Sequence, residues 1–475
     1  MAYRYGNRGQ INMFPASIEE YVGEEAPVRA YDAIVEAMDL KGLGVEIDEN
    51  QVGNSQYDPV SMIKLLLYGY SYGVRSSRKL ERETHYNLSF IWLMGGLRPD
   101  HKTIAEFRRN NRRALSEMLK QCARLCIKYG LIEGNTLFID GTKIRGNAGI
   151  HNTWTEKKCK KVLKHLDRRI DEILSECDAI DKEEEGQATL VELREEFKDK
   201  EDYKARVKGL LDELTDSEKK SINTTDRECT RVNSVQGTHA GYNAQVVVDE
   251  KEGLIVSSDV VSENNDLNQF ANQTEKANEI LGNRCKVSCA DSGYATTGEL
   301  EEVDKKGIKV VVPSQRQARK SEAREFDKTK FSYDSKRDCY ICPMGHRLKC
   351  SYAKGKGKER IYRVKDKRIC LTCVNYGRCT KSKEGRTIER MSNEEIRLRL
   401  EAQYEEAESQ KIYKLRKAKV EHPFGHIKRN LRMDGFLLRG LLGVKAEMSI
   451  LSVCFNVARM ITIFGVSCLI DKLGV

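Results

Sequence analysis

The sequence predicts an α/β protein in which a mixed-sheet core carries an N-terminal all-α domain and two insertions. Three observations support this: an N-terminal region with helical periodicity, short β-branched segments that alternate with helical ones, and two interrupting segments of different composition. A chain of 475 residues has room for about two to four domains at roughly 150 residues each. We expect domains at 1–130, at 131–330 together with 393–475, and at 331–392.

Residues 57–130 are predicted to be helical. Asp58-Pro59 is typical of a helix start, because Pro is tolerated in the first turn. Apolar residues then recur at helical spacing, and further helices are expected to begin near Ser77 and Pro99. Short helices with Arg on their outer faces are typical of a DNA-binding unit. A plain helical bundle with a role in dimerisation is the alternative.

Strands are predicted from residue 136 onward. Residues 136–145 are β-branched and aromatic, and Gly141 marks a bend or bulge in that strand. The further elements expected are strands at 242–249, 254–261, 286–291 and 308–313, and helices at 267–282 and 297–306. Three antiparallel strands followed by strand–helix alternation is the order of the ribonuclease H-like fold, and the pattern is compatible with that fold.

Two helical regions complete the core. Residues 155–224 are rich in Lys and Glu, lack Pro and carry apolar residues at helical spacing, so an inserted helical hairpin is expected. After a charged helix over 393–420, Pro423 is expected in the first turn of the last helix. An apolar C-terminal region follows at 436–470.

Basic residues are concentrated in three segments. The net charge is +10, and eight basic residues lie in each of Lys102–Lys128, Lys354–Arg368 and Lys411–Arg432, with no more than two acids in any of them. Separate basic blocks favour a polyanionic partner over a small acidic metabolite. Solvated helix faces are the alternative for any single block.

The apolar segments predict neither a membrane span nor export. The run from Met448 to Ile470 is broken by Asn456 and Arg459 and is expected to be a buried helix. The N-terminus has no apolar signal core, so a cytoplasmic, nucleoid-associated protein is expected. Fifteen cysteines, an odd number in a chain without an export signal, argue against a disulfide framework.

Three acids stand out by position. Asp140 lies on the first strand, Asp291 ends a later strand, and Glu421 is the only acid in the basic segment Lys411–Arg432. In a ribonuclease H-like order these carboxylates meet, and they then require cations to offset their repulsion. Oxygen ligands suit Mg²⁺ or Mn²⁺, and two such ions about 4 Å apart support phosphodiester chemistry.

The surrounding residues resemble those of a DDE transposase of a bacterial insertion sequence. Asp140-Gly-Thr-Lys-Ile resembles the first-aspartate strand, and Ala290-Asp291-Ser-Gly-Tyr294 resembles the second-aspartate motif. Tyr413-Lys-Leu-Arg416, followed by Glu421 through Lys428, resembles the Tyr-x2-Arg…Glu-x6-Lys signature. Tyr57-Asp-Pro and the segment 98–108 resemble the N-terminal helical domain of the same group, and Asp226 with the strand 241–245 fits its layout.

The resemblance implies a role for each residue of these motifs. Asp140, Asp291 and Glu421 would bind two catalytic Mg²⁺ or Mn²⁺ ions, while Lys428, Arg416 and Tyr413 would contact DNA near the element's end. Four residues separate Arg416 from Glu421 where the signature has three, so Lys417 competes for the Arg position. The other basic residues expected at DNA are Arg429, Arg75, Arg78, Arg108 and Arg109.

Six cysteines lie between Cys339 and Cys379 and suggest a zinc-ribbon-like insertion. Cys339-x2-Cys342 and Cys370-x2-Cys373 have the spacing of two zinc knuckles, and thiolates are the ligands of tetrahedral structural Zn²⁺. Two sets of four compete: Cys339, Cys342, Cys370 and Cys373, or the preferred Cys342, Cys370, Cys373 and Cys379, which matches a pattern in similar transposases. Reduced thiols without metal are the alternative.

The function expected from the resemblance is transposition. Such an enzyme binds the terminal inverted repeats of its element as double-stranded DNA, cleaves there with metal ions and joins the ends to target DNA. Pairing two ends implies a homodimer or larger assembly. A related Mg²⁺-dependent nuclease without strand transfer, and an inactive DNA-binding derivative, are the alternatives.

Overall fold

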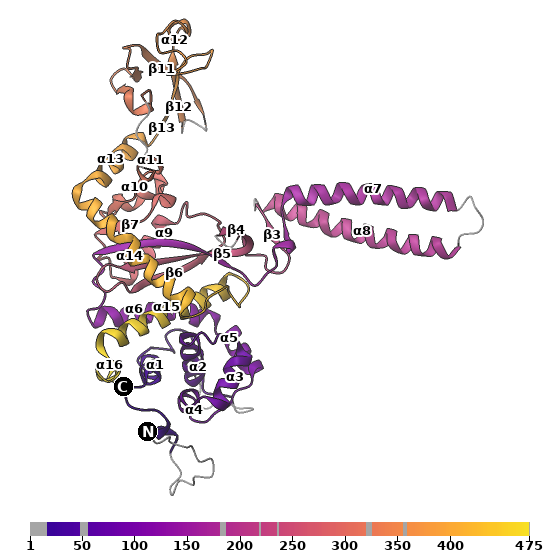
Figure 1. Ribbon diagram of the computed structural model, residues 1–475, viewed down its shortest axis with the longest axis vertical. Helices are drawn as coiled ribbons and strands as arrows, with labels where there is room; N and C mark the ends of the chain where they lie inside the picture. The colour runs from indigo at the N-terminus through magenta and orange to yellow at the C-terminus, as the bar shows by residue number, and fades with distance from the viewer. Residues whose placement is uncertain are drawn as a thin grey trace, which may run out of the picture. The chain divides into compact units, whose positions relative to one another are not determined.

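The computed structural model describes residues 17–47, 56–180, 187–217, 220–234, 237–319, 325–354 and 359–474 (Figure 1). The chain divides into two compact units. The first comprises Met1–Asp266, Lys276–Arg284 and Ala418–Val475, and the second comprises Leu267–Glu275 and Cys285–Lys417. Two helices, α9 (Phe270–Ile280) and α14 (Ala407–Arg429), contribute residues to both units.

The N-terminal helices begin where the sequence predicts. The Asp58 carboxylate caps α2 by accepting from the backbone N–H groups of Val60 and Ser61 at 3.2 and 2.8 Å, and Asp100 caps α5 through Thr103 N at 2.7 Å. The predicted helix after Pro99 is in fact two helices, divided at Asn111. The helices of this region are α1 (Pro27–Glu36), α2 (Pro59–Ser71), α3 (Ser77–Tyr86), α4 (Leu88–Leu93), α5 (His101–Asn110) and α6 (Arg112–Lys128), preceded by the 3-10 turn η1 (Ile18–Tyr21).

The core of the first unit is the apolar helix α15 (Leu441–Phe464). It packs against α6, α2 and the strand β6 (Ile255–Val261), and it is buried over most of its length. Within the described residues it is the single helix long and apolar enough to cross a bilayer, but 78% of its apolar window is buried inside the protein. The single helix predicted over Met448–Ile470 is interrupted in the structure. Gly465, with a φ of +78°, ends α15, and α16 (Val466–Leu473) begins directly after it.

A polar residue inside this apolar helix is fully satisfied. The Asn456 amide donates to Ile255 O at 2.8 Å and accepts from Ile255 N at 2.9 Å. One side chain therefore meets both backbone groups of the first residue of β6, and burying it does not leave an unpaired donor or acceptor.

The strands of the first unit are antiparallel. The long strand β5 (Gly237–Asp249) pairs with β1 (Thr136–Arg145) along one edge and with β4 (Thr230–Ser234) and β6 along the other. The short strands β2 (Thr153–Trp154) and β3 (Ile222–Asn223) pair at the base of a helical hairpin made by α7 (Glu156–Ile180) and α8 (Gln187–Asp216). This hairpin occupies the segment for which an inserted pair of helices is predicted, and Figure 1 shows it as an arm.

Gly141 was predicted to mark a bend or bulge, and the structure shows neither. Pairing runs in unbroken register through Asp140↔Val246 and Gly141↔Gln245. A Cβ at position 141 would lie 2.3 Å from Gln245 Nε2 and 2.6 Å from Asp266 Oδ1. Gly141 is required because Asp266 reaches under β1 and accepts hydrogen bonds from Lys143, Asn243 and Gln245.

The second unit contains a parallel strand pair and a separate small sheet. The pair is β7 (Val287–Cys289) with β8 (Lys309–Val311), and η3 (Ser292–Tyr294), α10 (Thr297–Lys305) and α11 (Gln315–Ala318) accompany it. Antiparallel strands in one unit and a parallel pair in the other, all accompanied by helices, confirm the α/β class. The ribonuclease H-like core stays a prediction.

Residues 332–391 form a five-stranded antiparallel sheet that was not predicted. Its spatial order is β13 (Thr387–Met391), β12 (Glu359–Val364), β11 (Arg347–Lys354), β10 (Cys339–Ile341) and β9 (Ser332–Asp334). Tyr340, Leu348 and Tyr362 form a hydrophobic core of its own. The Asp338 carboxylate accepts from the hydroxyls of Tyr333 and Tyr362 at 2.7 and 2.6 Å, so the polar ends of both core tyrosines have a hydrogen-bond partner.

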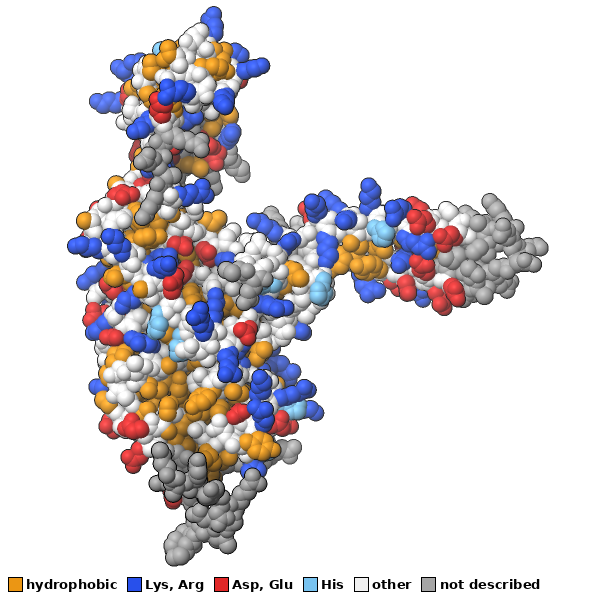
Figure 2. Space-filling model, in the orientation of Figure 1, with side chains coloured by type: hydrophobic (Ala, Val, Ile, Leu, Met, Phe, Trp, Pro, Cys, Tyr) orange, Lys and Arg blue, Asp and Glu red, His pale blue; other side chains and the backbone are white. Residues whose placement is uncertain are grey.

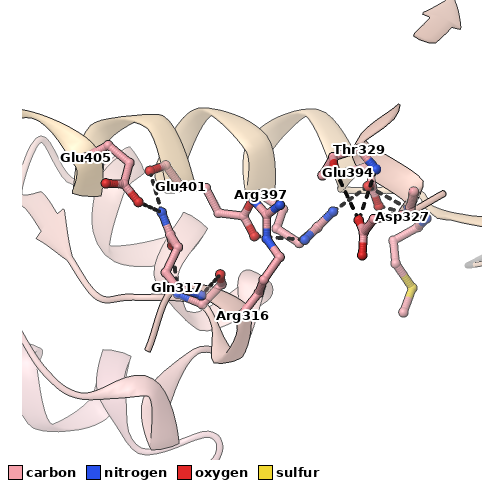
Figure 3. Close-up of polar contacts among 11 residues, drawn as sticks. Arg316, Gln317, Asp327, Thr329, Glu394, Arg397, Glu401 and Glu405 are labelled. Atoms are coloured by element: carbon pink, nitrogen blue, oxygen red, sulfur yellow. Dashed lines mark hydrogen bonds and ion pairs between the residues drawn. The ribbon is translucent and has the colours of Figure 1, made fainter. Parts of the chain in front are cut away.

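Ion pairs and a hydrogen bond stabilise helix α13 (Glu394–Glu405), which follows this sheet in the chain (Figure 3). Arg397 bridges Glu394 and Glu401 along the helix at 2.5 and 2.8 Å. Gln317 donates to Glu405 at 2.7 Å, which ties α11 to the same helix. The remaining elements of the unit are the short turns η4 (Lys328–Lys330) and α12 (Arg368–Leu371).

The contact at Gly141 generates a stability prediction. Gly141→Ala forces the Gln245–Asp266 cluster apart, and we expect it to lower the free energy of unfolding by about 1–3 kcal/mol. Gly209→Ala is the matched control, because Gly209 lies in the exposed part of α8 with nothing near its missing Cβ. That change is expected to stabilise by roughly 0.5–1 kcal/mol. Urea titrations of both variants measure this, and an unchanged Gly141→Ala midpoint would show that the cluster has room.

Candidate active site

Asp140 lies in the middle of β1, half-buried and paired with Val246 of β5. Its Oδ1 accepts from the Gly141 backbone N–H at 3.0 Å, which fixes one carboxylate oxygen. Side chains alternate between the two faces of a strand, so Thr142 shares a face with Asp140, while Gly141 and Lys143 face the Asp266 cluster on the other side. The predicted acid therefore lies on one face of β1, and a half-buried polar cluster lies on the other face.

The C-terminal end of α14 brings a cation to this face. Lys428 Nζ donates to Thr142 Oγ1 at 2.6 Å. Desolvation lowers the pKa of the Lys428 ammonium below its usual value, and the nearby Asp140 carboxylate opposes that shift. Asp140 and Lys428, which are far apart in the sequence, thus meet within the first unit.

Glu421 lies two turns before Lys428 and is exposed. Seven residues along a helix return to the same face, so the face of α14 that carries Glu421 is the one that carries Lys428. The opposite side is held by His422 and His426, whose rings pack edge-on against Phe455 of α15 at 5.4 and 5.5 Å. Burial lowers the pKa of both imidazoles, which favours their neutral form.

The expectation that Pro423 begins a helix is wrong. Pro423 lies inside α14, which is continuous over Ala407–Arg429. A proline within a helix costs a backbone hydrogen bond. Tertiary packing overrides that cost, because Val420, Phe424 and Ile427 are buried on the same helix.

Asp291 belongs to the second unit. It follows β7 after Ala290 and caps η3, its Oδ1 accepting from Gly293 N at 2.7 Å. Burial raises the pKa of the Tyr413 hydroxyl. The charge of Arg416 opposes this shift and the charge of Asp291 adds to it, because both side chains lie close to Tyr413. The Arg416 guanidinium lies 5.7 Å from the Tyr413 ring centroid.

The structure distinguishes Arg416 from Lys417, the two residues that compete for the Arg position of the signature. Arg416 is half-buried, and its charge also opposes the burial that raises the pKa of Cys289 to about 12. Lys417 is exposed. Arg416 is therefore the residue that accompanies Asp291 and Tyr413, despite its displacement by one position from the signature.

The acids are found in two places, Asp140 and Glu421 in the first unit and Asp291 in the second. Among the residues that the structure describes, no three His, Cys, Asp or Glu side chains are grouped as they stand to hold a metal ion. A shared metal site for all three carboxylates therefore stays a prediction.

Two of the arginines expected at DNA are buried, which corrects that expectation. Arg75 pairs with the fully buried Glu447 at 2.8 Å and donates to the carbonyls of Arg432 and Gly435 at 2.9 Å. Arg108 donates to Tyr70 Oη at 3.2 Å and to Arg75 O at 2.9 Å. Both guanidinium groups satisfy internal acceptors, so neither faces a phosphate.

The other predicted arginines remain on the surface. Arg78 and Arg429 are exposed, and Arg109 is 62% exposed with an ion pair to Glu106 at 3.0 Å. Figure 2 shows Lys and Arg side chains gathered over α3 and α5. Surface charges of this kind are available to DNA.

Four thiols line one cavity of the Cys-rich sheet: Cys342, Cys370, Cys373 and Cys379. Burial raises the pKa of the Cys379 thiol, Arg386 opposes the shift, and the other three thiols reinforce it. The Cys342 sulfur accepts from His346 N at 3.3 Å, across a turn closed by Gly345 N to Cys342 O. Cys339 is buried within β10 and does not line this cavity.

Thr142 is a site residue that the sequence analysis missed. It lies two positions after Asp140 and accepts from Lys428. The period of two along a strand places it on the acid's face, and this signal was present in the sequence. The polar cluster around Asp266 was also missed, because its members come from three separate segments.

Two family models match the chain. The one described as Transposase DDE domain matches residues 341–461, which include strands β11 to β13 of the Cys-rich sheet and all of α14. The one described as Transposase domain (DUF772) matches residues 16–110, the N-terminal helices as far as α5. No curated protein and no solved structure matches the chain.

Both matches are to transposases, the enzymes that move DNA segments, and they agree with the α/β fold and with the basic, carboxylate-bearing helix α14. Together the two family matches support a DDE transposase of an insertion sequence. Transposases act on DNA, and a DDE domain indicates in general a DNA-cutting enzyme that depends on a divalent metal.

The two groups of arginines generate a paired prediction. Arg75→Ala leaves Glu447 buried without its cation, and we expect a loss of about 3–5 kcal/mol of stability. Arg78→Ala should change stability by less than about 0.5 kcal/mol. It should weaken DNA binding and reduce the salt slope of binding by about one unit.

Thermal unfolding and salt-dependent DNA-binding titrations of the two variants separate these roles. A folded Arg75→Ala protein of normal stability would contradict the buried ion pair. An Arg78→Ala protein with the wild-type salt slope would remove Arg78 from the DNA surface.

Proposed function

We propose that this transposase binds the terminal inverted repeats of its element, cleaves the DNA at those ends and joins them to target DNA. In the reactive complex Asp140, Asp291 and Glu421 hold two Mg²⁺ or Mn²⁺ ions, and two ends are paired by a dimer or larger assembly. The observation that carries the proposal is the meeting of Lys428 with Asp140, because it places the Glu421–Lys428 face of α14 at the strand of the first aspartate.

The donor set fits divalent hard cations. All three side chains are carboxylates, which Mg²⁺ and Mn²⁺ prefer, and each is at least partly accessible to solvent. The Asp140 carboxylate already attracts the Lys428 ammonium, as expected of an acid in a site that needs positive charge. When bound, two metal ions activate the attacking oxygen and stabilise the leaving oxygen of a phosphodiester.

The chain's own residues position the DNA for this reaction. Lys428 is held by Thr142 beside Asp140, where its ammonium can contact a phosphate next to the scissile bond. Arg416 and Tyr413, beside Asp291, supply a second cation and a hydroxyl donor for the backbone. Exposed Arg429, Lys417, Arg78 and Arg109 extend the basic surface.

The Cys-rich sheet is proposed to bind one structural Zn²⁺ through Cys342, Cys370, Cys373 and Cys379. These four thiols line the same cavity, and the Cys342 sulfur accepts the His346 backbone N–H at 3.3 Å, which orients that sulfur. Tetrahedral thiolate coordination would contribute directly to the stability of this small sheet.

The catalytic assignment predicts the loss of cleavage without the loss of DNA binding. Asp140→Asn and Asp291→Asn remove a charged metal ligand but keep the shape of the side chain. Losing several kcal/mol of metal-derived stabilisation, at about 1.4 kcal/mol per tenfold, lowers the cleavage rate roughly a thousandfold. The assay uses a plasmid carrying the DNA that flanks the gene, with Mg²⁺ or Mn²⁺.

Asp471→Asn is the matched control, since Asp471 is an exposed acid on α16. Wild type and control should cut at the ends of the inverted repeat. Cuts scattered without regard to the ends would favour a general nuclease, and end binding by the wild type without cuts would favour an inactive DNA-binding derivative.

The zinc assignment predicts about one zinc per chain in protein purified without chelator. Cys379→Ser should lose the metal, because its sulfur lines the shared cavity. Cys339→Ser should retain it, because Cys339 lies in β10 outside that cavity. Metal analysis of both variants decides between the two cysteine sets, and the reverse result would establish the symmetrical set instead.

A further inference from the structure

Charge is divided along helix α7 of the helical arm. After Glu156, the first half of the helix carries seven basic residues and one acid. The second half, which begins at Ile170, carries four acids and no basic residue. Figure 2 shows the same division, with Lys and Arg side chains on the part of the arm nearest the strands and Asp and Glu side chains farther out.

Four of these basic residues form one stripe. Lys157, Lys161, Lys164 and Arg168 are spaced by four, three and four positions, which places them on a single face of the helix. All four are exposed, and the Arg168 side chain is 70% exposed. Among the described residues, no ion pair or hydrogen bond involves the side chains of Lys157, Lys161 or Lys164.

The stripe works against the stability of its own helix. Like charges three or four residues apart destabilise a helix by roughly 0.2–0.5 kcal/mol per pair, and cations are unfavourable near a helix N-terminus. Where the two halves meet, cations are paired as on a normal solvated helix: Arg168 pairs with Glu172, and Arg169 pairs with Glu172 and Glu176 along α7 and with Glu196 on α8. The three lysines of the stripe have no such ion pair among the described residues. The stripe thus requires an explanation other than helix stability.

The base of the arm holds this stripe in place. Trp154, Cys159 and Val207 are the centre of a buried cluster between α7, α8 and the β2–β3 pair. Lys158, which is not part of the stripe, lies 4.4 Å from the Trp154 ring centroid and donates to the carbonyls of His151 and Thr153. An anionic partner would therefore meet four cations on a prearranged surface, with little ordering cost.

We propose that the stripe of Lys157, Lys161, Lys164 and Arg168 binds the phosphate backbone of duplex DNA. From Lys157 to Arg168, eleven steps of about 1.5 Å along the helix, the stripe extends about 16 Å. Duplex DNA presents one phosphate charge per about 1.7 Å of its axis, so four contacts are available along that length. The proposal rests on the proposed function, because it assumes DNA as the substrate. It adds an arm contact outside the residues of the transposase motifs.

The test compares two variants with the same change in net charge. One carries Lys157→Gln, Lys161→Gln, Lys164→Gln and Arg168→Gln. The other carries Lys160→Gln, Lys198→Gln, Arg206→Gln and Lys208→Gln, which neutralise exposed residues of the same arm outside the stripe. Binding of the full-length proteins to two duplexes, one with the inverted repeat that flanks the gene and one scrambled, is titrated from low to high salt with Ca²⁺ in place of Mg²⁺.

The stripe variant should lose three to four units of salt slope, about 0.9 for each phosphate contact, on both duplexes alike. The control variant should lose less than about one unit. Thermal unfolding should show the stripe variant at least as stable as wild type, because its like-charge repulsion is gone.

Three results would overturn the proposal. Equal slopes for the two variants would show that total charge, not the stripe, matters. A loss confined to the repeat-bearing duplex would indicate base reading instead of phosphate contact. A variant that binds DNA normally but no longer self-associates in sedimentation would assign the stripe to a second copy of the chain. A wild-type protein that binds neither duplex would refute the proposed function itself.

Discussion

The first unit depends on one buried ion pair. Glu447 is fully inaccessible in the core helix α15, and Arg75 supplies its cation from the loop after α2. The second carboxylate oxygen of Glu447 accepts from the backbone N–H groups of Leu437 and Leu438 at 2.9 and 3.1 Å. The pair therefore joins the N-terminal helices, the core helix and the segment that follows α14.

That segment continues the connection to the site. Phe436 N donates to Arg145 O at 2.8 Å, at the end of the strand that carries Asp140. Lys428 and the last turn of α14 lie only a few residues earlier. Burying a charge pair contributes little to stability by itself, but breaking it costs much. The value of this pair is positional: the first aspartate strand and the end of α14 are both attached to the same anchored segment.

The sequence predicted those features that depend on local chemistry. The helix starts at Asp58-Pro59 and near Pro99 were predicted, and the α/β class and the helical arm followed from periodicity. Features that depend on distant partners were not predictable. Arginine is usually a surface residue, but Arg75 and Arg108 are buried. Glu447, Tyr70 and backbone carbonyls from distant parts of the chain accept their hydrogen bonds. Gly141 was interpreted as a bend, since nothing local indicates that Asp266 approaches from another loop. Pro423 was placed at a helix start because the packing that carries α14 through it comes from other elements.

The contact between Asn456 and Ile255 has a consequence for solubility. Within the described sheet, β6 pairs with β5 alone, so its other edge would present free backbone groups to any extended chain. A side-chain amide has the same donor and acceptor as a peptide group, and Asn456 uses both on the first residue of that edge. At this residue, helix α15 makes the two backbone hydrogen bonds that a neighbouring strand would otherwise make to β6. At Ile255, the backbone groups on this edge of β6 are therefore not free to pair with another extended chain.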